Sequence, residues 1–248
     1  EHILSTLDAV SIDEVVIIHS PEAKKDLKEE TATRENITYV EQTEALGTAH
    51  ALKAALPHVT TDNLLVLLGD VPLLSQPTIN KLQEETQNND LVVLTGTVSD
   101  PSGYGRINKD DSGKPRAIIE ELDCNDEQRK IKEINSGIMA FKTNVARNLV
   151  DKIKPNPKKN EYYLTDAIEI AYHEGLETMS YSVSEAEIFG VNSKRDLAEA
   201  EKINRKNIAD ELMDNGVTVI DPDRIDVRGT LTCGQNVTID VNTVFIGD

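Results

Sequence analysis

The chain has 248 residues, of which 44 are acidic and 26 basic, so that its formal net charge is −18. Hydrophobic residues make up 38% and charged residues 28%, which is ordinary for a globular protein with one large core, or one large and one small. The negative charge repels nucleic acid and anionic lipid, no apolar run approaches the roughly 20 residues that span a bilayer, and no signal-peptide pattern opens the chain, so we expect neither a nucleic-acid nor a membrane partner.

Short apolar runs alternate with helical patterns along the first hundred residues. Apolar residues from Ile3 to Val10 recur at helical spacing, so that the chain opens within a helix. Apolar runs predict strands at 14–19, 37–41, 64–68 and 91–98, with helices at 48–56 and 77–87. This alternation predicts an α/β fold with a Rossmann-like, mostly parallel sheet covered by helices on both faces.

The second part of the chain is less regular. Strands are predicted at 116–119 and 134–141, and helices at 163–173 and 194–213, the latter ending at Asn215-Gly216. We expect three parts: a domain of residues 1–193, a long connecting helix at 194–216, and a small domain of residues 217–248.

After the long helix, apolar residues recur every six positions. Ile225, Leu231 and Val237 have small, polar or glycine residues between them, which is typical of a left-handed hexapeptide β-helix whose apolar residues fill the edges of a triangular coil. The stretch is long enough for little more than one coil. Since the chain also opens on Glu1 rather than methionine, we expect it to be processed, trimmed or a fragment.

A buried strand leads directly into Gly69-Asp70-Val71-Pro72-Leu73. In open parallel sheets, ligands bind beyond the carboxyl ends of the strands, and a carboxylate there can hold Mg²⁺ against a nucleotide phosphate. A polyanionic substrate needs such a cation in a chain with this net charge. The turn alone is explained equally well by an aspartate that caps a helix or closes a turn.

A second polar cluster follows the strand at 37–41. Gln42 can pair with the edge of a base, Gly47 lets the backbone approach a ligand, and Thr48 can donate at a helix N-terminus. The alternative is a solvated Gln42 beside a helix cap at Gly47-Thr48. His50 is expected to pack or cap, and no role is assigned to it.

Other polar groups are suited to a sugar or a metal. Gly103-Tyr104-Gly105-Arg106 is either a loop over a small ligand or a simple hairpin turn. Acceptors and donors suited to hydroxyls and an amide come from Glu120-Glu121, Asn135-Ser136-Gly137 and Tyr162 to Asp166, which can equally be surface or capping groups. Asn192, after Gly190-Val191, can offer a carbonyl oxygen to a metal.

Taken together and in this order, the motifs resemble those of the bifunctional N-acetylglucosamine-1-phosphate uridyltransferase / glucosamine-1-phosphate acetyltransferase family. They are Gln42, Leu46 to His50, Gly69 to Leu73, Gly103 to Arg106, Glu133 to Gly137, Glu161 to Asp166, Gly190 to Asn192, and Arg228 to Leu231. The resemblance covers essentially the whole chain. It implies a nucleotidyltransferase sheet whose first strand is missing from this chain, followed by the long helix and the start of the β-helix.

The resemblance also implies roles for the matching positions. Gln42, Gly47 and Thr48 would contact the nucleotide, Asp70 and Asn192 would bind Mg²⁺, and the sugar pocket would be lined by Gly105, Glu120, Asn135, Tyr163 and Thr165. The implied substrates are UTP and N-acetylglucosamine 1-phosphate, and the implied products are UDP-N-acetylglucosamine and pyrophosphate, in cytoplasmic synthesis of cell-envelope precursors. The two isolated cysteines fit a reducing cytoplasm. The family's β-helix implies a homotrimer for the full-length parent.

Two departures from the family remove positive charge. The Arg of its glycine-rich loop and a following Lys precede the stretch present here, so that no catalytic residue is assigned, and Leu122 stands where the family usually has Lys. We expect little uridyltransferase activity from the chain alone. The alternatives are a non-catalytic remnant or sugar-binding module that lacks the triphosphate loop, and a nucleotidyltransferase that uses thymidine nucleotides.

Overall fold

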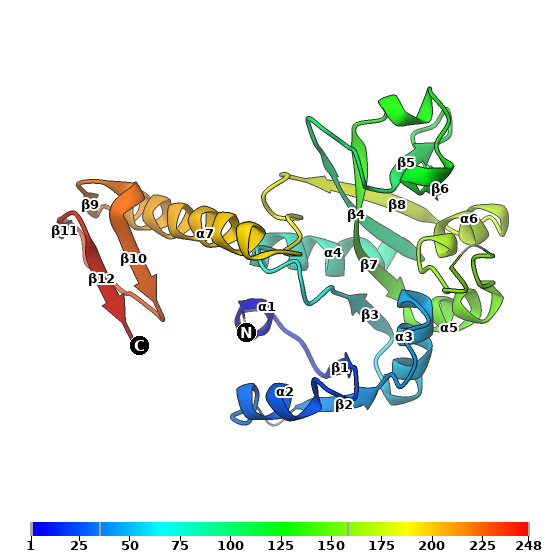
Figure 1. The fold of residues 1–248 in the computed structure, drawn as a ribbon, viewed down its shortest axis with the longest axis horizontal. Helices are drawn as coiled ribbons and strands as arrows, with labels where there is room; N and C mark the ends of the chain where they lie inside the picture. Colours follow the sequence, from blue (N-terminus) through cyan, green and yellow to red (C-terminus); the bar gives the residue numbers. More distant parts are fainter. Residues whose placement is uncertain (1, 35, 158, 248) are drawn as a thin grey trace. The chain divides into compact units, whose positions relative to one another are not determined.

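In the computed structural model of the chain, which describes residues 2–34, 36–157 and 159–247, the chain divides into two compact units (Figure 1). The first is Glu1–Ile188 and the second is Phe189–Asp248. The outermost residues of the predicted domain ranges, Glu1 and Asp248, lie outside the described residues.

The first unit alternates strands and helices, as the apolar runs predicted. Its helices are α1 (His2–Asp8), α2 (Lys24–Glu30), α3 (Thr48–Ala55), α4 (Gln76–Asn88), α5 (Thr143–Lys152) and α6 (Asp166–His173). Its strands are β1 (Val15–His19), β2 (Ile37–Glu41), β3 (Asn63–Val66), β4 (Leu91–Thr97), β5 (Arg106–Lys109), β6 (Pro115–Ile119), β7 (Glu133–Lys142) and β8 (Thr178–Val183).

Six of these strands form the central sheet of the described chain. Their order is β6-β5-β7-β4-β8, and β3 also pairs with β7. Strands β3, β4, β5 and β8 run in one direction, because β7 is antiparallel to β3, β4 and β5, whereas β8 is parallel to β4. The mixed α/β fold with a mostly parallel strand direction is therefore confirmed, with β7 in the middle and β6 at the edge running the other way.

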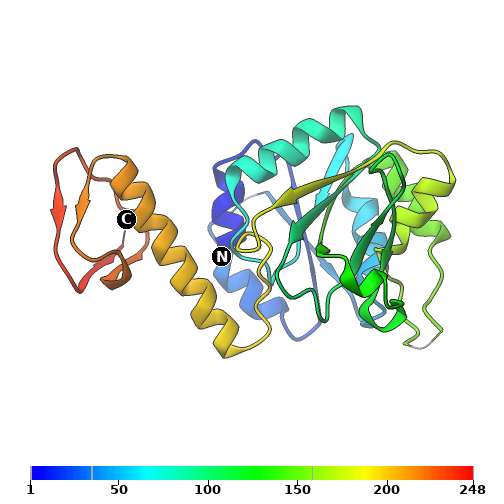
Figure 2. The same cartoon turned by 90° about the horizontal axis from the view of Figure 1, so that it is seen from above.

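Helices cover both faces of this sheet (Figure 2). On one face, residues of α3, α5 and α6 pack with Val93, Met139 and Phe141 in one buried cluster. On the other, Ile79 and Leu82 of α4 pack with Val92 and with its sheet neighbours in a second cluster. Helix α4 begins where it does because Ser75 Oγ accepts the Thr78 N–H and Pro77 fits the first turn.

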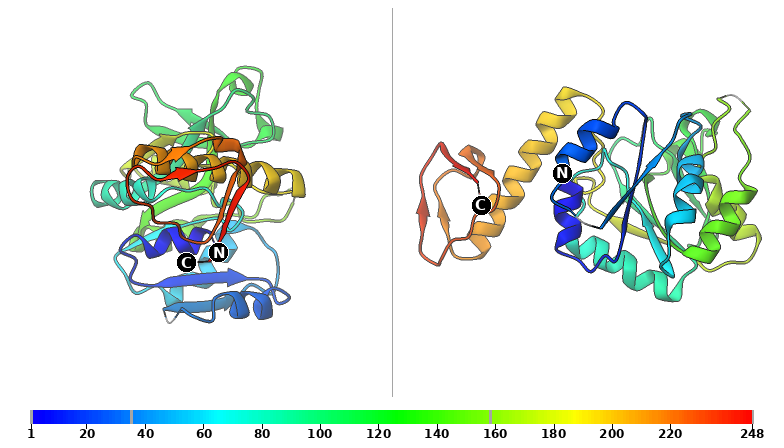
Figure 3. Two further views of the ribbon diagram at one scale, coloured as in Figure 1. Left: turned by 90° about the vertical axis from the view of Figure 1, so that its left-hand side faces the viewer. Right: turned by 90° about the horizontal axis from the view of Figure 1, so that it is seen from below.

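Strands β1 and β2 pair in parallel and form a two-stranded sheet of their own, separate from the six-stranded sheet (Figures 1 and 3). The start of β1 is tied to the start of β3 by Glu14. Its carboxylate accepts the Thr60 N–H at 2.6 Å and the Thr61 N–H at 3.3 Å, just before β3 begins. These hydrogen bonds, that of the Thr60 backbone first, hold the pKa of Glu14 below its usual value.

The second unit opens with helix α7 (Lys194–Asp214), whose start is capped by Ser193 Oγ, which accepts the Asp196 N–H. The helix ends at Asp214 with Asn215 as its C-cap, and Gly216 follows with a φ of 86°, a left-handed conformation that stops a helix. In the described ranges, no helix is both long enough and apolar enough to cross a bilayer; α7 has the length but carries charged residues along it.

Short strands follow α7 and pair in parallel. β10 (Ile225–Arg228) pairs with β12 (Thr243–Ile246) at a spacing of 18 residues, and β9 (Thr218–Val219) pairs with β11 (Thr238–Ile239) at a spacing of 20. A spacing of 18 is three six-residue steps, which is what one coil of the predicted β-helix requires. The β-helix itself stays a prediction.

Of the three residues expected to point into the β-helix coil, the prediction is wrong for Val237. Ile225 is buried and Leu231 is partly buried in the same cluster, but Val237 is 37% exposed and lies outside it. Ile239 is buried in its place. Eight residues, rather than six, separate Leu231 from Ile239, and a turn with Asn236 at a φ of 62° lies between them; the inward position is therefore displaced locally, while β10 and β12 keep their spacing of 18 residues.

Replacing Glu14 tests the link between β1 and β3. We expect Glu14→Ala to lower the free energy of unfolding by about 1 kcal/mol at pH 7, because the Thr60 and Thr61 N–H groups lose a charged acceptor at a partly exposed site. Since the folded-state pKa of Glu14 is lowered, this contribution is lost as the pH falls through that pKa, so the difference should shrink in urea titrations near pH 3. Asp13→Ala, at the exposed neighbouring carboxylate, is the control; equal losses in both variants would contradict the link.

Candidate active site

Asp70 lies in the turn that follows β3, beyond the carboxyl end of that strand. The Leu68 side chain occupies the place that a Cβ on Gly137 would take, which brings the segment before this turn against the middle of β7. The Asp70 carboxylate is exposed and makes no hydrogen bond or ion pair with another described residue. It is therefore available to a ligand at the edge of the sheet where open α/β sheets bind ligands.

Four residues predicted to line a sugar pocket lie together. Thr165 Oγ1 donates to Glu120 Oε1 at 3.3 Å, and the Asn135 N–H donates to Gly105 O at 2.9 Å. A Cβ at Gly105 would come within 2.8 Å of the Ile118 side chain, so that glycine lets this backbone pack against Ile118, with the Glu120 carboxylate close by. The group presents a carboxylate, a hydroxyl and an amide, which are the partners that sugar hydroxyls and an N-acetyl group require.

A buried ion pair holds the loop beside this group. Arg106 is 2% exposed, its guanidinium donates to Glu121 Oε2 at 2.5 Å and to the Tyr104 carbonyl, and Glu121 Oε2 also accepts the Gly103 N–H. The hydrogen bond from Arg106, helped by that of the Gly103 N–H and by the Arg106 charge, holds the pKa of Glu121 below its usual value. The loop of residues 103–105 and the strand end that carries Glu120 are thereby fixed to each other.

The predicted nucleotide residues form a second group. The Gln42 N–H donates to His19 O at 2.9 Å, and its side-chain Nε2 lies 3.3 Å from Gly47 O and 2.9 Å from His50 Nδ1. Gly47 precedes α3 with a φ of 97°, and a Cβ there would lie 2.5 Å from Tyr162 O, so that a side chain is excluded on both counts. Thr48 Oγ1 accepts the Leu164 N–H at 3.1 Å.

The two groups are joined by the segment from Tyr162 to Thr165. Tyr162 donates its N–H to Leu46 O at 2.7 Å and accepts the Ala49 N–H at 3.0 Å, while Thr165 reaches Glu120. Tyr163 lies between them with its side chain partly buried, and its carbonyl accepts the Asp166 N–H, but the side chain makes no hydrogen bond to another described residue. This one short segment therefore connects the predicted sugar-binding residues with the predicted nucleotide residues Gln42, Gly47 and Thr48.

A carboxyl group beside this segment has an unusual environment. Burial, followed by the charges of Glu169 and Glu120, raises the pKa of Asp166 to about 6. Asp166 belongs to the predicted polar group of residues 162–166, but no role was assigned to it, because its position next to Thr165 in the sequence does not reveal how much the fold covers it.

The predicted metal ligands lie in different units. Asp70 belongs to the first unit and Asn192 to the second, where the Asn192 N–H donates to Asp196 Oδ2 at 3.0 Å and its side-chain amide is left exposed. Within the described residues, no three His, Cys, Asp or Glu side chains group closely enough to hold a metal by themselves. The two residues fit Mg²⁺ by donor type, since each offers an oxygen that is not engaged with another described side chain.

Sequence reasoning missed two contributors to this site. His50 was expected to pack or cap, yet its ring contacts the Gln42 amide and lies 6.4 Å from the Tyr162 ring. Arg106 was expected in a loop over a ligand or in a simple hairpin turn, and its place as the buried first residue of β5 was not foreseen. Neither partnership has a local sequence signal, because eight residues separate Gln42 from His50 and fifteen separate Arg106 from Glu121.

Comparisons with known proteins agree with this architecture. The model of the nucleotidyl transferase family matches residues 1–204. The bifunctional protein GlmU of Francisella tularensis subsp. novicida (strain U112) is 39% identical over 249 residues, which cover 100% of this chain and 54% of that protein. The chain thus spans about half the length of the curated relatives that it matches, and the family resemblance inferred from the motifs is confirmed.

Solved structures support the fold. A Bacillus anthracis protein described as a glucose-1-phosphate thymidylyltransferase, in complex with a sucrose, superposes with a TM-score of 0.62 at 21% identity and covers 80% of both chains. UDP-glucose pyrophosphorylase complexed with UDP-glucose also gives a TM-score of 0.62, at 15% identity, and covers 83% of this chain and 86% of that chain. At these identities the likeness concerns the fold alone.

The raised pKa of Asp166 makes a prediction for stability. The folded state favours the protonated Asp166 carboxyl. The protonated carboxyl therefore contributes its full stability below pH 3.8, and this contribution is lost as the pH rises through about 6. We expect Asp166→Asn to raise the free energy of unfolding by about 1–3 kcal/mol at pH 8, at roughly 1.4 kcal/mol per pKa unit, and to leave it nearly unchanged at pH 4. Urea titrations at the two pH values measure this; an Asp166→Asn variant no more stable than wild type at pH 8 would contradict it.

Proposed function

The chain belongs to the nucleotidyl transferase family, and from this membership we propose that the protein forms UDP-N-acetylglucosamine and pyrophosphate from UTP and N-acetylglucosamine 1-phosphate. Its relatives include the bifunctional protein GlmU at 39% identity, and the motifs from Gln42 to Asn192 support the choice of nucleotide and sugar. The proposal concerns the full-length gene product, meaning this chain with any residues that its gene encodes on either side.

One observation carries the proposal: the group of residues suited to a nucleotide and the group suited to a sugar are joined by the Tyr162–Thr165 segment. Thr48 Oγ1 accepts the Leu164 N–H, and Thr165 Oγ1 donates to Glu120, so that a single short segment contacts both groups. A nucleotide-sugar has the same two parts joined by a diphosphate. Placing the two binding groups side by side is what a transfer between two bound substrates needs.

In the proposed reaction, a phosphate oxygen of N-acetylglucosamine 1-phosphate attacks the α-phosphorus of UTP. The new bond joins that oxygen to the α-phosphorus, the bond from the α-phosphorus to the bridging oxygen breaks, and pyrophosphate leaves with the electron pair. The attacking oxygen is already anionic, so no protein base is required. Binding and orientation by the chain supply the catalysis: Gln42, Gly47 and Thr48 hold the nucleoside, and the sugar is held by Gly105, Glu120, Asn135, Tyr163 and Thr165.

Magnesium is the cofactor that we propose, with Asp70 and Asn192 as the residues that would hold it. Bound there, it would neutralise the negative charge that gathers on the phosphates. The exposed and unpaired Asp70 carboxylate supports this role. For the full-length gene product we also propose a cytoplasmic homotrimer, on the strength of the family resemblance alone.

A second candidate function, a sugar-binding module without turnover, is favoured by one residue. Leu122 is 76% exposed at the position where the resembled family usually has Lys. In the sequence it follows Glu121, the partner of Arg106, and stands two residues after Glu120. An exposed apolar side chain there offers no charge to a phosphate. We infer that the chain alone has little uridyltransferase activity.

Pyrophosphate release tests the proposal. The full-length gene product, mixed with Mg²⁺, UTP and N-acetylglucosamine 1-phosphate, should release pyrophosphate and form UDP-N-acetylglucosamine. Glucose 1-phosphate should be a much poorer substrate, because the amide and hydroxyl partners near Asn135 and Thr165 would lack the N-acetyl group. Binding of UDP-N-acetylglucosamine without turnover would favour the sugar-binding module, and an equal rate with glucose 1-phosphate would contradict the proposed sugar.

Asp70→Asn tests the metal role. We expect a fall in kcat of at least about 100-fold in the full-length gene product, because a neutral amide neither attracts Mg²⁺ nor offsets phosphate charge as a carboxylate does. The control is Asp62→Asn, which removes an exposed carboxylate just before the opposite end of β3. Unchanged activity in Asp70→Asn, or equal losses in both variants, would contradict a role for Asp70.

A further inference from the structure

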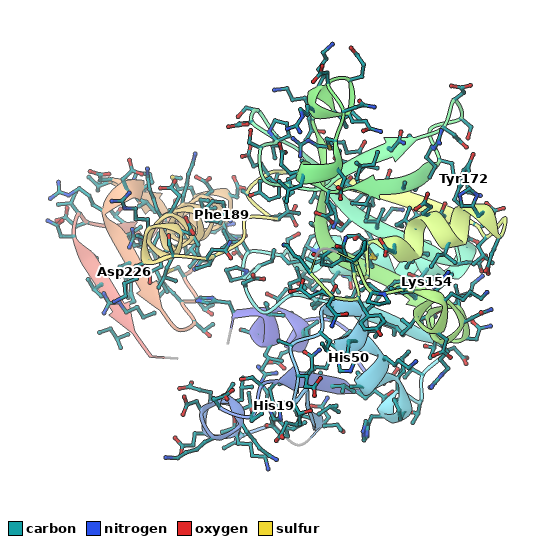
Figure 4. All side chains as sticks on the ribbon, turned by 45° about the vertical axis from the view of Figure 1, so that its right-hand side comes forward. His19, His50, Lys154, Tyr172, Phe189 and Asp226 are labelled. Atoms are coloured by element: carbon teal, nitrogen blue, oxygen red, sulfur yellow. The ribbon has the colours of Figure 1, made fainter. Side chains whose placement is uncertain are left out.

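The side-chain amide of Gln42, in the nucleotide group, is held by two other parts of the chain. It follows β2 directly, and its backbone N–H is fixed by His19 O. Its side-chain nitrogen Nε2 faces two groups at once, Gly47 O at 3.3 Å and His50 Nδ1 at 2.9 Å. Both lie at the start of α3, and Figure 4 shows His50 on that helix.

The chemistry of these neighbours fixes which end of the amide faces them. The Gly47 carbonyl can only accept, and it already accepts the Ala51 N–H at 3.1 Å. If the amide were reversed, Gln42 Oε1 would face the Gly47 oxygen, and two acceptors would meet. The NH₂ end therefore faces Gly47, and His50 Nδ1 must be an acceptor, with its ring proton on Nε2.

His50 is a firm partner for this hydrogen bond. It stands in the first turn of α3, where the Ala49 N–H is bonded to Tyr162 O, and its ring packs against the Tyr162 ring at 6.4 Å with an angle of 33°. Because α3 and the Tyr162 segment both hold the ring, the acceptor at Nδ1 stays in place. The shorter of the two contacts to the Gln42 amide is the one that His50 makes.

We propose that His50 is a positioning residue that makes Gln42 present its carbonyl oxygen to the base, and that this selects uracil over cytosine. With both protons of Nε2 directed to Gly47 and His50, Oε1 is the end left for a ligand, and it can only accept. Uracil carries a hydrogen on N3 and can donate to it. Cytosine has a lone pair at N3, so that two acceptors would face each other.

This inference rests on the proposed function, since it concerns the base of the nucleotide that the same site would bind. The choice of pyrimidine would then depend on a residue that does not touch the base, His50, through its hydrogen bond to the Gln42 side chain. Removing the His50 acceptor leaves only the longer contact to Gly47, so that the amide can rotate and offer a donor to cytosine at lower cost.

The test compares kcat/KM for UTP and for CTP in the full-length gene product. Wild type should prefer UTP, and His50→Leu should lower the UTP-to-CTP ratio by about 10- to 100-fold, the range for an unpaired buried hydrogen-bonding group. His50→Asn should keep the ratio within about threefold, because the Asn Oδ1 can accept at the place of Nδ1. His58→Leu, at an exposed histidine just after α3, is the matched control and should keep the wild-type ratio.

A ratio unchanged in His50→Leu, or lowered equally in His50→Leu and His50→Asn, would overturn the proposal. If wild type uses UTP and CTP equally, the base selection itself is absent and the proposal is wrong. A simple loss of fold stability would lower both rates and leave their ratio unchanged, so the ratio distinguishes positioning from packing.

A measurement without nucleotide decides the inference separately from the proposed function. Nitrogen-15 NMR of histidine-labelled wild-type protein at pH 8 reports which ring nitrogen carries the proton. We expect the His50 proton on Nε2, with Nδ1 accepting from the Gln42 amide. A proton on Nδ1 would overturn the proposal even if the enzyme makes UDP-N-acetylglucosamine, whereas absence of turnover with the proton on Nε2 would contradict the proposed function and leave the Gln42 orientation standing.

Discussion

Tyr162 donates its backbone N–H to Leu46 O at 2.7 Å and accepts the Ala49 N–H on its own carbonyl at 3.0 Å, and the candidate site is built around this pair of bonds. They lock the turn before α3 against the segment before α6. Gly47 sits between them, and the absence of a side chain there lets the two backbones touch. This contact fixes α3, which carries Thr48 and His50, relative to the segment that carries Thr165. A shift of the Tyr162 segment would move Thr48, His50 and Thr165 together.

The second fixed point is the buried guanidinium of Arg106. Its bond to Glu121 and to the Tyr104 carbonyl holds the glycine loop against the strand end that carries Glu120. A buried charge of this kind is a poor source of stability but a strong constraint on geometry, because moving either partner leaves an uncompensated charge. The cost of the acidic surroundings is visible at Asp166, whose pKa is raised by burial and by its neighbours Glu169 and Glu120. In a chain of net charge −18, neighbouring carboxylates of this kind repel one another and any bound anion.

Much of the fold was predictable from the sequence, because the signals are local. Buried runs such as 91–98 are recognisable by apolar content, and the start of α7 follows from Ser193 as a cap. Helix α5 was not predicted, since it begins at Thr143 directly after β7 ends at Lys142, with no turn residue to mark the change. Val237 was misplaced because Ile239 takes the inward position after a local turn at Asn236, which periodicity alone does not reveal.

The candidate site was likewise predictable only in part. Which residues gather was predictable from motifs in a fixed order, and Gly105, Glu120, Asn135 and Thr165 do lie together. The orientation of the side chains was not predictable, because it depends on partners distant in the sequence. His50 orients the Gln42 amide, and Glu121 orients the Arg106 guanidinium. The roles of these residues toward a ligand remain predictions.

The central claim is that the Gln42 group and the Glu120 group form the two ends of one nucleotide-sugar site. A crystal structure of the full-length gene product with UDP-N-acetylglucosamine tests it most directly. We expect uracil N3–H to donate to Gln42 Oε1, with the sugar bound against Glu120 and Thr165 in the same molecule. A ligand bound elsewhere, or with its sugar away from Glu120 while the uracil lies at Gln42, would contradict it.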